Sequence, residues 1–239
     1  MTNYYLLLIQ FLFALAGLFL FWQSIIYFRR MWQYKRLKST PFPHAYENIL
    51  LKIEHYKLLS PKYKEKIQLM ILAFTENKEF IETKMTINDE VKVTIAFYAC
   101  LMRLGFEFGE KDNVSTIIVY PEHFILNHSD TIGGIRHHET YLLEGQSANG
   151  AVAISWQDIK SNIVQHLKEN VILHEFAHEL DFEDGFADGT PVLEGSKYRT
   201  WSRLFSQAFD TLQQKKHSVE VAFLGTYALK NEAEFFAVC

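Results

Sequence analysis

The first 28 residues of the chain carry no charged side chain, and this feature constrains the fold more than any other. Residues 4–28 are rich in Leu, Phe, Ala and Ile. As a helix they would extend about 37 Å, enough to cross a hydrocarbon core of roughly 30 Å. Tyr and Trp residues gather towards both ends of the run, as interfacial aromatic residues do. We therefore predict a single transmembrane helix at residues 1–28.

The apolar run is followed by a basic segment. Its basic residues are Arg29, Arg30, Lys35, Arg36 and Lys38, and it contains no acidic residue. A cleaved signal peptide carries its positive charge before the apolar run, whereas here the charge comes after it. By the positive-inside rule, this flank and everything after it lie in the cytoplasm. We expect a single-pass protein of the inner (cytoplasmic) membrane.

The rest of the chain is predicted to form one domain. Thr40-Pro-Phe-Pro43 marks a linker, so we assign residues 29–44 to a basic juxtamembrane segment with a linker and 45–239 to the domain. All acidic residues of the chain follow residue 38. The domain is therefore acidic and has no basic stripe, which argues against direct binding of nucleic acid.

Local patterns predict that this domain belongs to the α+β class. We expect helices at 45–58, 61–76, 88–104, around 170–181, near 195–216 and from about 228. We expect strands at 114–120 and 151–156. The two cysteines, Cys100 and Cys239, cannot form a disulfide framework, and Cys100 lies in an apolar helical run typical of a core.

The stretch VILHEFAHELD, residues 171–181, contains the pattern HExxH. His174 and His178 are four residues apart, so they share one face of a helix, and Glu175 points about 100° further round. Two neutral imidazoles on one face can hold a metal ion while the carboxylate reaches its water. A purely structural helix would have to bury these polar groups without partners. We therefore predict one Zn²⁺ per chain, bound by the two histidines, with Glu175 as general base.

Catalytic zinc needs a third protein ligand and leaves its fourth position to water. Asp184 is one candidate, but it requires a sharp turn, and the position where a glycine would make that turn is Asp181. Glu232 and Glu234 in the C-terminal run TYALKNEAEFFAV are the others. In a continuous helix, Glu234 would share a face with Tyr227, two turns earlier, so that one group binds the metal and the other donates to an oxyanion. This pairing favours Glu234.

Asp181 itself has two open roles. It lies one helical turn after His178 and seven residues after His174. It could accept a ring N–H and so orient a metal ligand, or it could equally end the helix.

These motifs together resemble the Mlc titration factor A-like family of zinc metallopeptidases, a gluzincin-like group. The similar stretches are HEFAHELD, DGFADGTP, TYALKNEAEFFAV, FTENKEF at 74–80, INDEVKVTIAFYACLMRLG at 87–105, IIVYPEHF at 117–124 and GQSANGAVAISW at 145–156. The resemblance covers about residues 45–239 and implies a zincin-like peptidase fold.

The resemblance also implies roles for individual residues. It makes His174, His178 and Glu234 the zinc ligands, Glu175 the general base and Tyr227 the transition-state donor. It makes residues 151–156 the edge strand against which a peptide lies. His137, beside His138, falls near the place where some family members carry an additional histidine close to the metal, although such a loop pair is more often solvated.

The family contains cytosolic peptidases with aminopeptidase-like activity, and one member binds a sugar-responsive transcriptional repressor. The resemblance therefore implies a membrane-anchored zinc peptidase that acts on a peptide or protein substrate. The alternative is a zinc-stabilised binding module that sequesters a regulatory protein, such as a repressor, with little catalysis. The chain stops five residues after Glu234, where the family continues through more helix, so we expect a truncated C-terminus.

Overall fold

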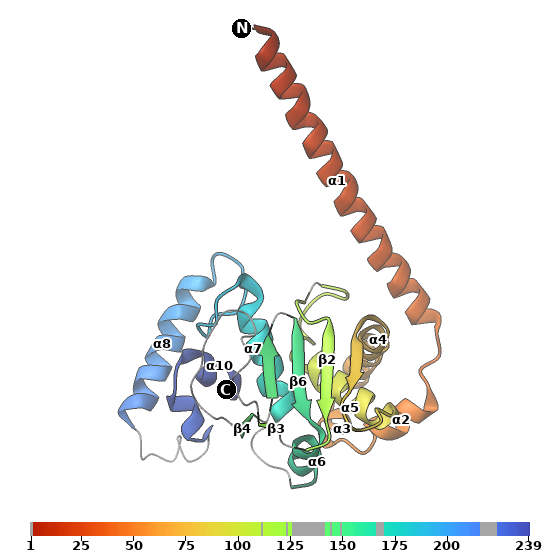
Figure 1. Ribbon diagram of the computed structural model, residues 1–239, viewed down its shortest axis with the longest axis vertical. Coiled ribbons are helices and arrows are strands. Elements are labelled where there is room, and N and C mark those ends of the chain that lie inside the picture. Colours follow the sequence, from red (N-terminus) through yellow and green to blue (C-terminus); the bar gives the residue numbers. More distant parts are fainter. Residues whose placement is uncertain are drawn as a thin grey trace.

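A computed structural model of the chain describes residues 2–110, 112–122, 124–125, 142–143, 145–148, 150–165, 170–215 and 224–239. It consists of one long N-terminal helix and a domain in which helices surround a small sheet (Figure 1). The C-terminus lies within the domain, close to helices α7, α8 and α10. The domain is a helix-rich mixture of helices and strands, so the predicted mixed class is confirmed.

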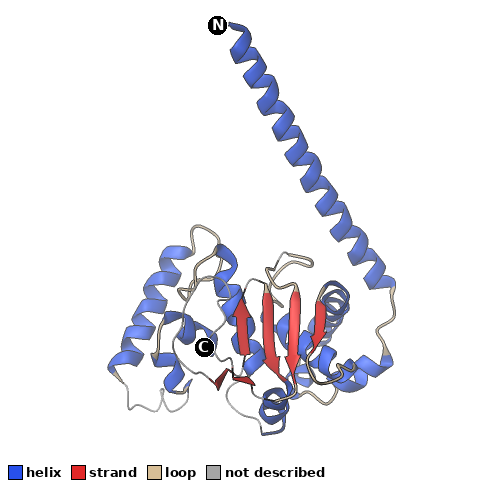
Figure 2. Cartoon of the chain, in the orientation of Figure 1, coloured by secondary structure: helices blue, strands red, loops and turns tan. Residues whose placement is uncertain are grey.

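Helix α1 (Thr2–Ser39) is continuous over 38 residues. Its N-terminal part projects away from the domain (Figures 1 and 2), and the side chains of residues 4–28 are exposed almost throughout. Among the described helices, it is the one long and apolar enough to cross a membrane by length and composition.

The last turns of α1 are packed against the domain. The Leu37 side chain is buried. The Gln33 amide donates a hydrogen bond of 2.9 Å to the side-chain oxygen of Asn77, at the end of helix α4 (Pro61–Asn77), and Arg36 forms an ion pair with Glu76. The basic segment is therefore helical and lies on α4, and the chain leaves the helix only at the predicted Pro-rich linker.

The sheet contains four strands in the order β1-β2-β6-β5. They are β1 (Glu79–Glu82), β2 (Thr116–Tyr120), β6 (Ala151–Ser155) and β5 (Gly145–Ala148). β1, β2 and β6 are parallel, and β5 runs antiparallel to β6. A separate antiparallel pair is formed by β3 (Phe124–Ile125) and β4 (Leu142–Leu143).

The prediction that residues 151–156 form an edge strand is wrong, because β6 lies between β2 and β5. Gly150 has a φ of 78°, which favours glycine, and a Cβ there would lie 2.5 Å from the backbone oxygen of Asn113. This turn folds residues 145–148 back onto β6, so β5 forms the edge. Trp156, the last residue of the predicted strand, begins helix α6.

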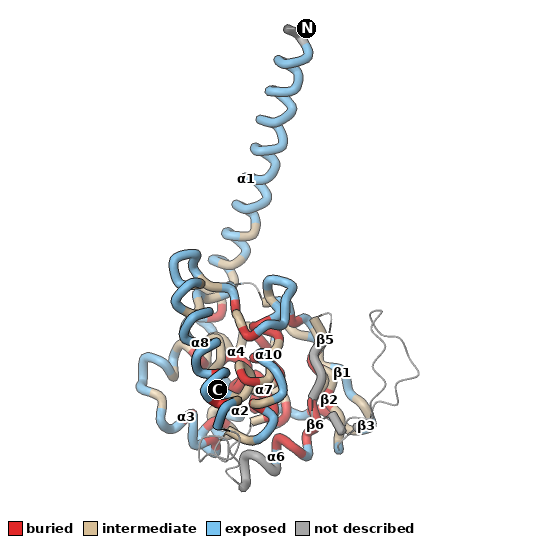
Figure 3. The backbone as a smooth tube through the Cα atoms, turned by 90° about the vertical axis from the view of Figure 1, so that its left-hand side faces the viewer, coloured by how far each residue is buried: buried red, intermediate tan, exposed pale blue. Residues whose placement is uncertain are grey.

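The helices pack mainly on one side of the sheet (Figure 3). They are α2 (His44–Leu50), α3 (Glu54–Leu58), α4, α5 (Asp89–Met102), α6 (Trp156–Gln165), α7 (Val171–Asp181), α8 (Tyr198–Gln214) and α10 (Glu232–Val238), with short 3₁₀ helices η1 (Phe182–Asp184) and η2 (Thr226–Leu229). Helix α5 is almost entirely buried and contacts α2, α4 and α7. The core therefore lies between α5 and the sheet, and α7 is packed directly onto it.

Candidate metal centre

Helix α7 presents two histidines on one face. Its first turn is capped by Asn170, whose side-chain oxygen accepts hydrogen bonds from the backbone N–H groups of Ile172 at 3.0 Å and Leu173 at 3.2 Å. The His174 and His178 rings are partly buried, and their Nε2 atoms lie 3.1 Å apart. The rings therefore converge on one point, as the HExxH spacing predicts.

Glu234 reaches the same point from helix α10. Asn231 caps that helix, because its side-chain oxygen accepts a hydrogen bond of 2.8 Å from the Glu234 N–H. The next residue, Phe235, is buried in a cluster with Phe209, Leu212 and Ala228. Glu234 Oε2 lies 3.3 Å from the Nε2 atom of each histidine. The cap and the buried phenylalanine fix the position from which this carboxylate approaches.

The three converging atoms are arranged to bind a metal ion rather than to hydrogen-bond with one another. Glu234 Oε2 is buried and accepts no hydrogen bond from the described residues. Two neutral imidazole nitrogens and a carboxylate oxygen facing one point need a proton or a cation between them. Within the described ranges, His174, His178 and Glu234 are also the group of three whose ligand atoms lie close enough to hold a metal ion, all within 4.8 Å.

Burial and the neighbouring histidines together shift the pKa values of the two carboxyl groups of the site in opposite directions. Burial alone would raise the pKa of Glu234, but the attraction of His174 and His178 outweighs it and holds the pKa well below its usual range. Burial raises the pKa of Glu175 to about 7, against the opposing attraction of the two histidines. Glu234 is thus ready to bind a cation as a carboxylate, whereas Glu175 exchanges its proton near neutral pH.

Tyr227 lies beside His174, although it is not placed there by a helix shared with Glu234. The centroid of its ring is 6.0 Å from that of His174. Tyr227 and Glu234 do not share a continuous helix, the condition on which their pairing was argued, because η2 ends at Leu229 and Asn231 adopts an extended conformation to cap α10. Tyr227 and Glu234 therefore come from two separate elements that pack against each other.

Asp184 and Asp181 make other contacts and do not join the three ligand atoms. Asp184 is exposed, and its Oδ1 accepts a hydrogen bond of 3.0 Å from the Phe186 N–H. Asp181 is fully buried, and its Oδ2 accepts a bond of 2.9 Å from the Gly189 N–H, so it anchors the loop that follows α7. His137 lies outside the described residues.

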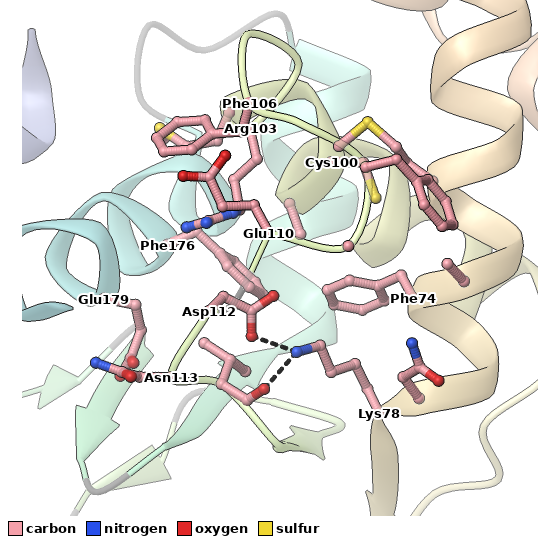
Figure 4. Close-up of a pocket in the computed structure, with 18 of the residues that line it drawn as sticks. Phe74, Lys78, Cys100, Arg103, Phe106, Glu110, Asp112, Asn113, Phe176 and Glu179 are labelled. Carbon is pink, nitrogen blue, oxygen red and sulfur yellow. Dashed lines mark hydrogen bonds and ion pairs between the residues drawn. The ribbon is translucent and has the colours of Figure 1, made fainter. Parts of the chain in front are cut away.

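A cavity of about 280 Å³ lies on the other side of α7 (Figure 4). Phe176 and Glu179 from α7 line it, at positions roughly 140–200° around the helix from His174. Lys78 fills part of it, where it pairs with Asp112 and donates to the Val114 carbonyl. The cavity is therefore separated from the histidines by the helix itself.

Sequence reasoning missed Lys230, which lies next to the group. Its Nζ is 3.6 Å from Oε1 of Glu234 and 5.0 Å from the centroid of the Tyr227 ring. The signal was present in the spacing, since Lys230 follows Tyr227 by three residues and precedes Glu234 by four.

Comparison with known proteins identifies the family of the chain. The profile of the glucose-regulated metallo-peptidase M90 family matches residues 28–239. The chain belongs to this family. M90 membership implies a metal-dependent peptidase, and the family resemblance drawn from the motifs is thereby confirmed. The matched region includes the turns of α1 that pack on the domain.

Relatives of this M90 chain include proteins with and without a functional name. An uncharacterized protein of Synechocystis sp. is 30% identical over 214 residues, which cover 87% of this chain and 78% of the relative. Mlc titration factor A of Pectobacterium atrosepticum is 29% identical over 187 residues, covering 75% and 70%. Mlc titration factor A of Cronobacter sakazakii is 29% identical over 189 residues, covering the same shares.

Proposed function

We propose that the chain is a membrane-anchored zinc peptidase whose metal is held by His174, His178 and Glu234. The observation that carries this proposal is the triangle formed by the two Nε2 atoms and Glu234 Oε2, with sides of 3.1, 3.3 and 3.3 Å. Tetrahedral zinc with bonds of roughly 2.0–2.1 Å places its ligand atoms about 3.3–3.4 Å apart. Two imidazoles and one carboxylate also suit zinc in donor type.

When bound, zinc would polarise the scissile carbonyl and lower the pKa of the water it holds. Glu175 would take the proton from the attacking water and pass it to the leaving amine, a role that suits a carboxyl whose burial favours its protonated form. Tyr227, which is half-exposed beside His174, would donate a hydrogen bond to the oxyanion.

The edge strand β5 is the proposed place for a peptide substrate. An edge strand leaves one row of backbone N–H and C=O groups unpaired within the sheet, and an extended peptide can add to it. β5 contacts α7, so a peptide on this edge would pass close to the histidines. Backbone pairing of this kind supports peptides as the substrate class and does not choose between aminopeptidase and endopeptidase action.

The contacts of α1 support a domain held at the membrane surface. The side chain of Arg30 lies against Gly109, and the rings of Tyr34 and Phe108 meet edge to face, with centroids 5.2 Å apart. Because Arg30 is the second residue after the end of the apolar run at Phe28, the loop at residues 105–110 would lie where that run leaves the membrane. The positive-inside rule, applied to the basic residues after the apolar run, supports a cytoplasmic position for the catalytic domain.

A second function is favoured by the name of the relatives, Mlc titration factor A. A domain of this family could bind and sequester a regulatory protein, with zinc serving mainly to stabilise it. Such a binder would not need Glu175 or Tyr227 in place beside the metal ligands, so the peptidase remains the first proposal.

The test uses the full chain in detergent micelles, loaded with zinc and mixed with a defined peptide library. Mass spectrometry of the products identifies the bonds that are cut, and Glu175→Gln serves as the control. Cleavage that depends on Glu175 would support the peptidase, and the cut positions would separate the two modes of action. A chain that holds zinc and cleaves nothing would point to the binding module.

A further inference from the structure

Lys230 forms an ion pair with the carboxylate of Glu234, at the other oxygen from the one that faces the histidines. One oxygen of that carboxylate, Oε2, faces both Nε2 atoms at 3.3 Å. The other oxygen, Oε1, lies 3.6 Å from the Lys230 ammonium. The two oxygens of one ligand are therefore divided between the metal position and a fixed cation.

The local backbone explains how the lysine reaches this place. Lys230 is the capping residue directly after the 3₁₀ helix η2, and its N–H donates a hydrogen bond of 3.0 Å to the Tyr227 carbonyl. Side chains three residues apart eclipse each other in a 3₁₀ helix, so the lysine stem lies along Tyr227. Asn231 then turns the chain into α10, whose first turn contains Glu234. One short segment thus supplies all three side chains.

The contacts have a chemical consequence for the metal ligand. A carboxylate can bind a metal through one oxygen or through both, and the second mode occupies a position that catalytic zinc leaves to water. An ammonium held at Oε1 competes for that oxygen and leaves only Oε2 for the metal. The same ammonium lies 5.0 Å from the centroid of the Tyr227 ring, within the range of a cation–π contact, so it also restrains the phenol.

We propose that Lys230 is a positioning residue, which keeps Glu234 in single-oxygen ligation and holds Tyr227 beside His174. The inference rests on the proposed metal site, and it adds a residue that neither HExxH nor the distal glutamate identifies. Lys230 acts through Glu234 and Tyr227 and is not assigned any contact with the substrate.

The test replaces zinc by Co²⁺ in the full chain, in detergent micelles, because the visible absorption of Co²⁺ weakens when its coordination number rises above four. The variants are Lys230→Met, which keeps the length and loses the charge, and Lys230→Arg, which keeps a cation. Lys197→Met is the matched control, because Lys197 is exposed and pairs with Glu194 at 3.1 Å.

We expect weaker Co²⁺ absorption for Lys230→Met and a spectrum close to that of the parent for Lys230→Arg and Lys197→Met. With zinc, kcat of Lys230→Met should fall about tenfold, as is usual for partners of metal ligands, while KM changes little. A general structural defect would instead alter KM and the bound metal content.

An unchanged cobalt spectrum in Lys230→Met would overturn the inference, as would an equal change in Lys197→Met. A spectrum that depends on Lys230 in a chain that cleaves no peptide would support the positioning role and refute the peptidase. A parent chain that binds no Co²⁺ would overturn both.

Discussion

Replacing Glu175 by glutamine tests the chemistry and the energetics of the site together. Glu175 is 6% exposed, and burial raises its pKa from 4.5 to about 7. Each tenfold change in proton affinity corresponds to about 1.4 kcal/mol, so ionising this carboxyl in the metal-free folded chain costs roughly 3 kcal/mol more than in the unfolded chain. Glutamine has nearly the same shape and never ionises, so it removes this cost.

The direction of the pH dependence follows from the raised pKa. The folded chain holds the Glu175 proton more tightly than the unfolded chain does, so the associated stability is fully present below pH 4.5. It is lost as the pH rises to about 7. Metal-free Glu175→Gln should therefore match the parent near pH 4 and exceed it by about 3 kcal/mol at pH 8. For a domain of this size, that is roughly 6–12 °C in Tm.

The assay is thermal unfolding of the full chain in micelles, with metal removed by a chelator, at both pH values. Glu194→Gln is the control, because Glu194 is exposed. With zinc added, Glu175→Gln should retain the metal and lose about 10²–10⁴-fold in kcat, the usual contribution of a general base. A stability difference that does not depend on pH would refute the burial argument. Retained turnover would refute the general base.

Three further substitutions test other parts of the structure. Glu234→Ala should weaken zinc binding well over tenfold, measured by competition with a chromophoric chelator, because it removes one of the three proposed ligands; unchanged binding would exclude Glu234 as a ligand. Gly150→Ala should lower the free energy of unfolding by more than about 1 kcal/mol, seen as a lower Tm. The reason is that φ is 78° and the added Cβ would meet a backbone oxygen at 2.5 Å. Leu37→Ala should cost about 2–5 kcal/mol of domain stability in the same unfolding assay, whereas exposed Leu20→Ala should cost none; equal effects would show that α1 is not part of the domain fold.

The part of the site on α7 could be predicted from the sequence because one local pattern determines it. The apolar spacing of residues 171–181 fixes the helix, Asn170 caps it, and the four-residue interval places both histidines on one face. The strands β2 and β6 were also predictable, since buried parallel strands read as short apolar runs.

The remaining parts depend on interactions that the local sequence does not display. β5 has the polar sequence GQSA and is a strand because Gly150 turns it onto β6. β1 is four residues long with two glutamates, and pairing with β2 defines it. The helical spacing of Tyr227 and Glu234 predicted their proximity for a wrong reason, because Asn231 interrupts the helix with its own side chain.

The candidate metal centre also lies between two parts of the domain that have separate buried clusters. The histidines belong to α7, whose Ile172 and Phe176 lie in the main core with the sheet. Glu234 belongs to α10, whose Phe235 lies in the smaller cluster with α8. A metal bound by all three would connect the clusters at the point where substrate is proposed to act. That cross-link depends on the ligand side chains remaining in place. The Asn231 cap and Lys230 both hold Glu234. They would therefore contribute to the stability of the contact between the two clusters and to the chemistry of the metal site.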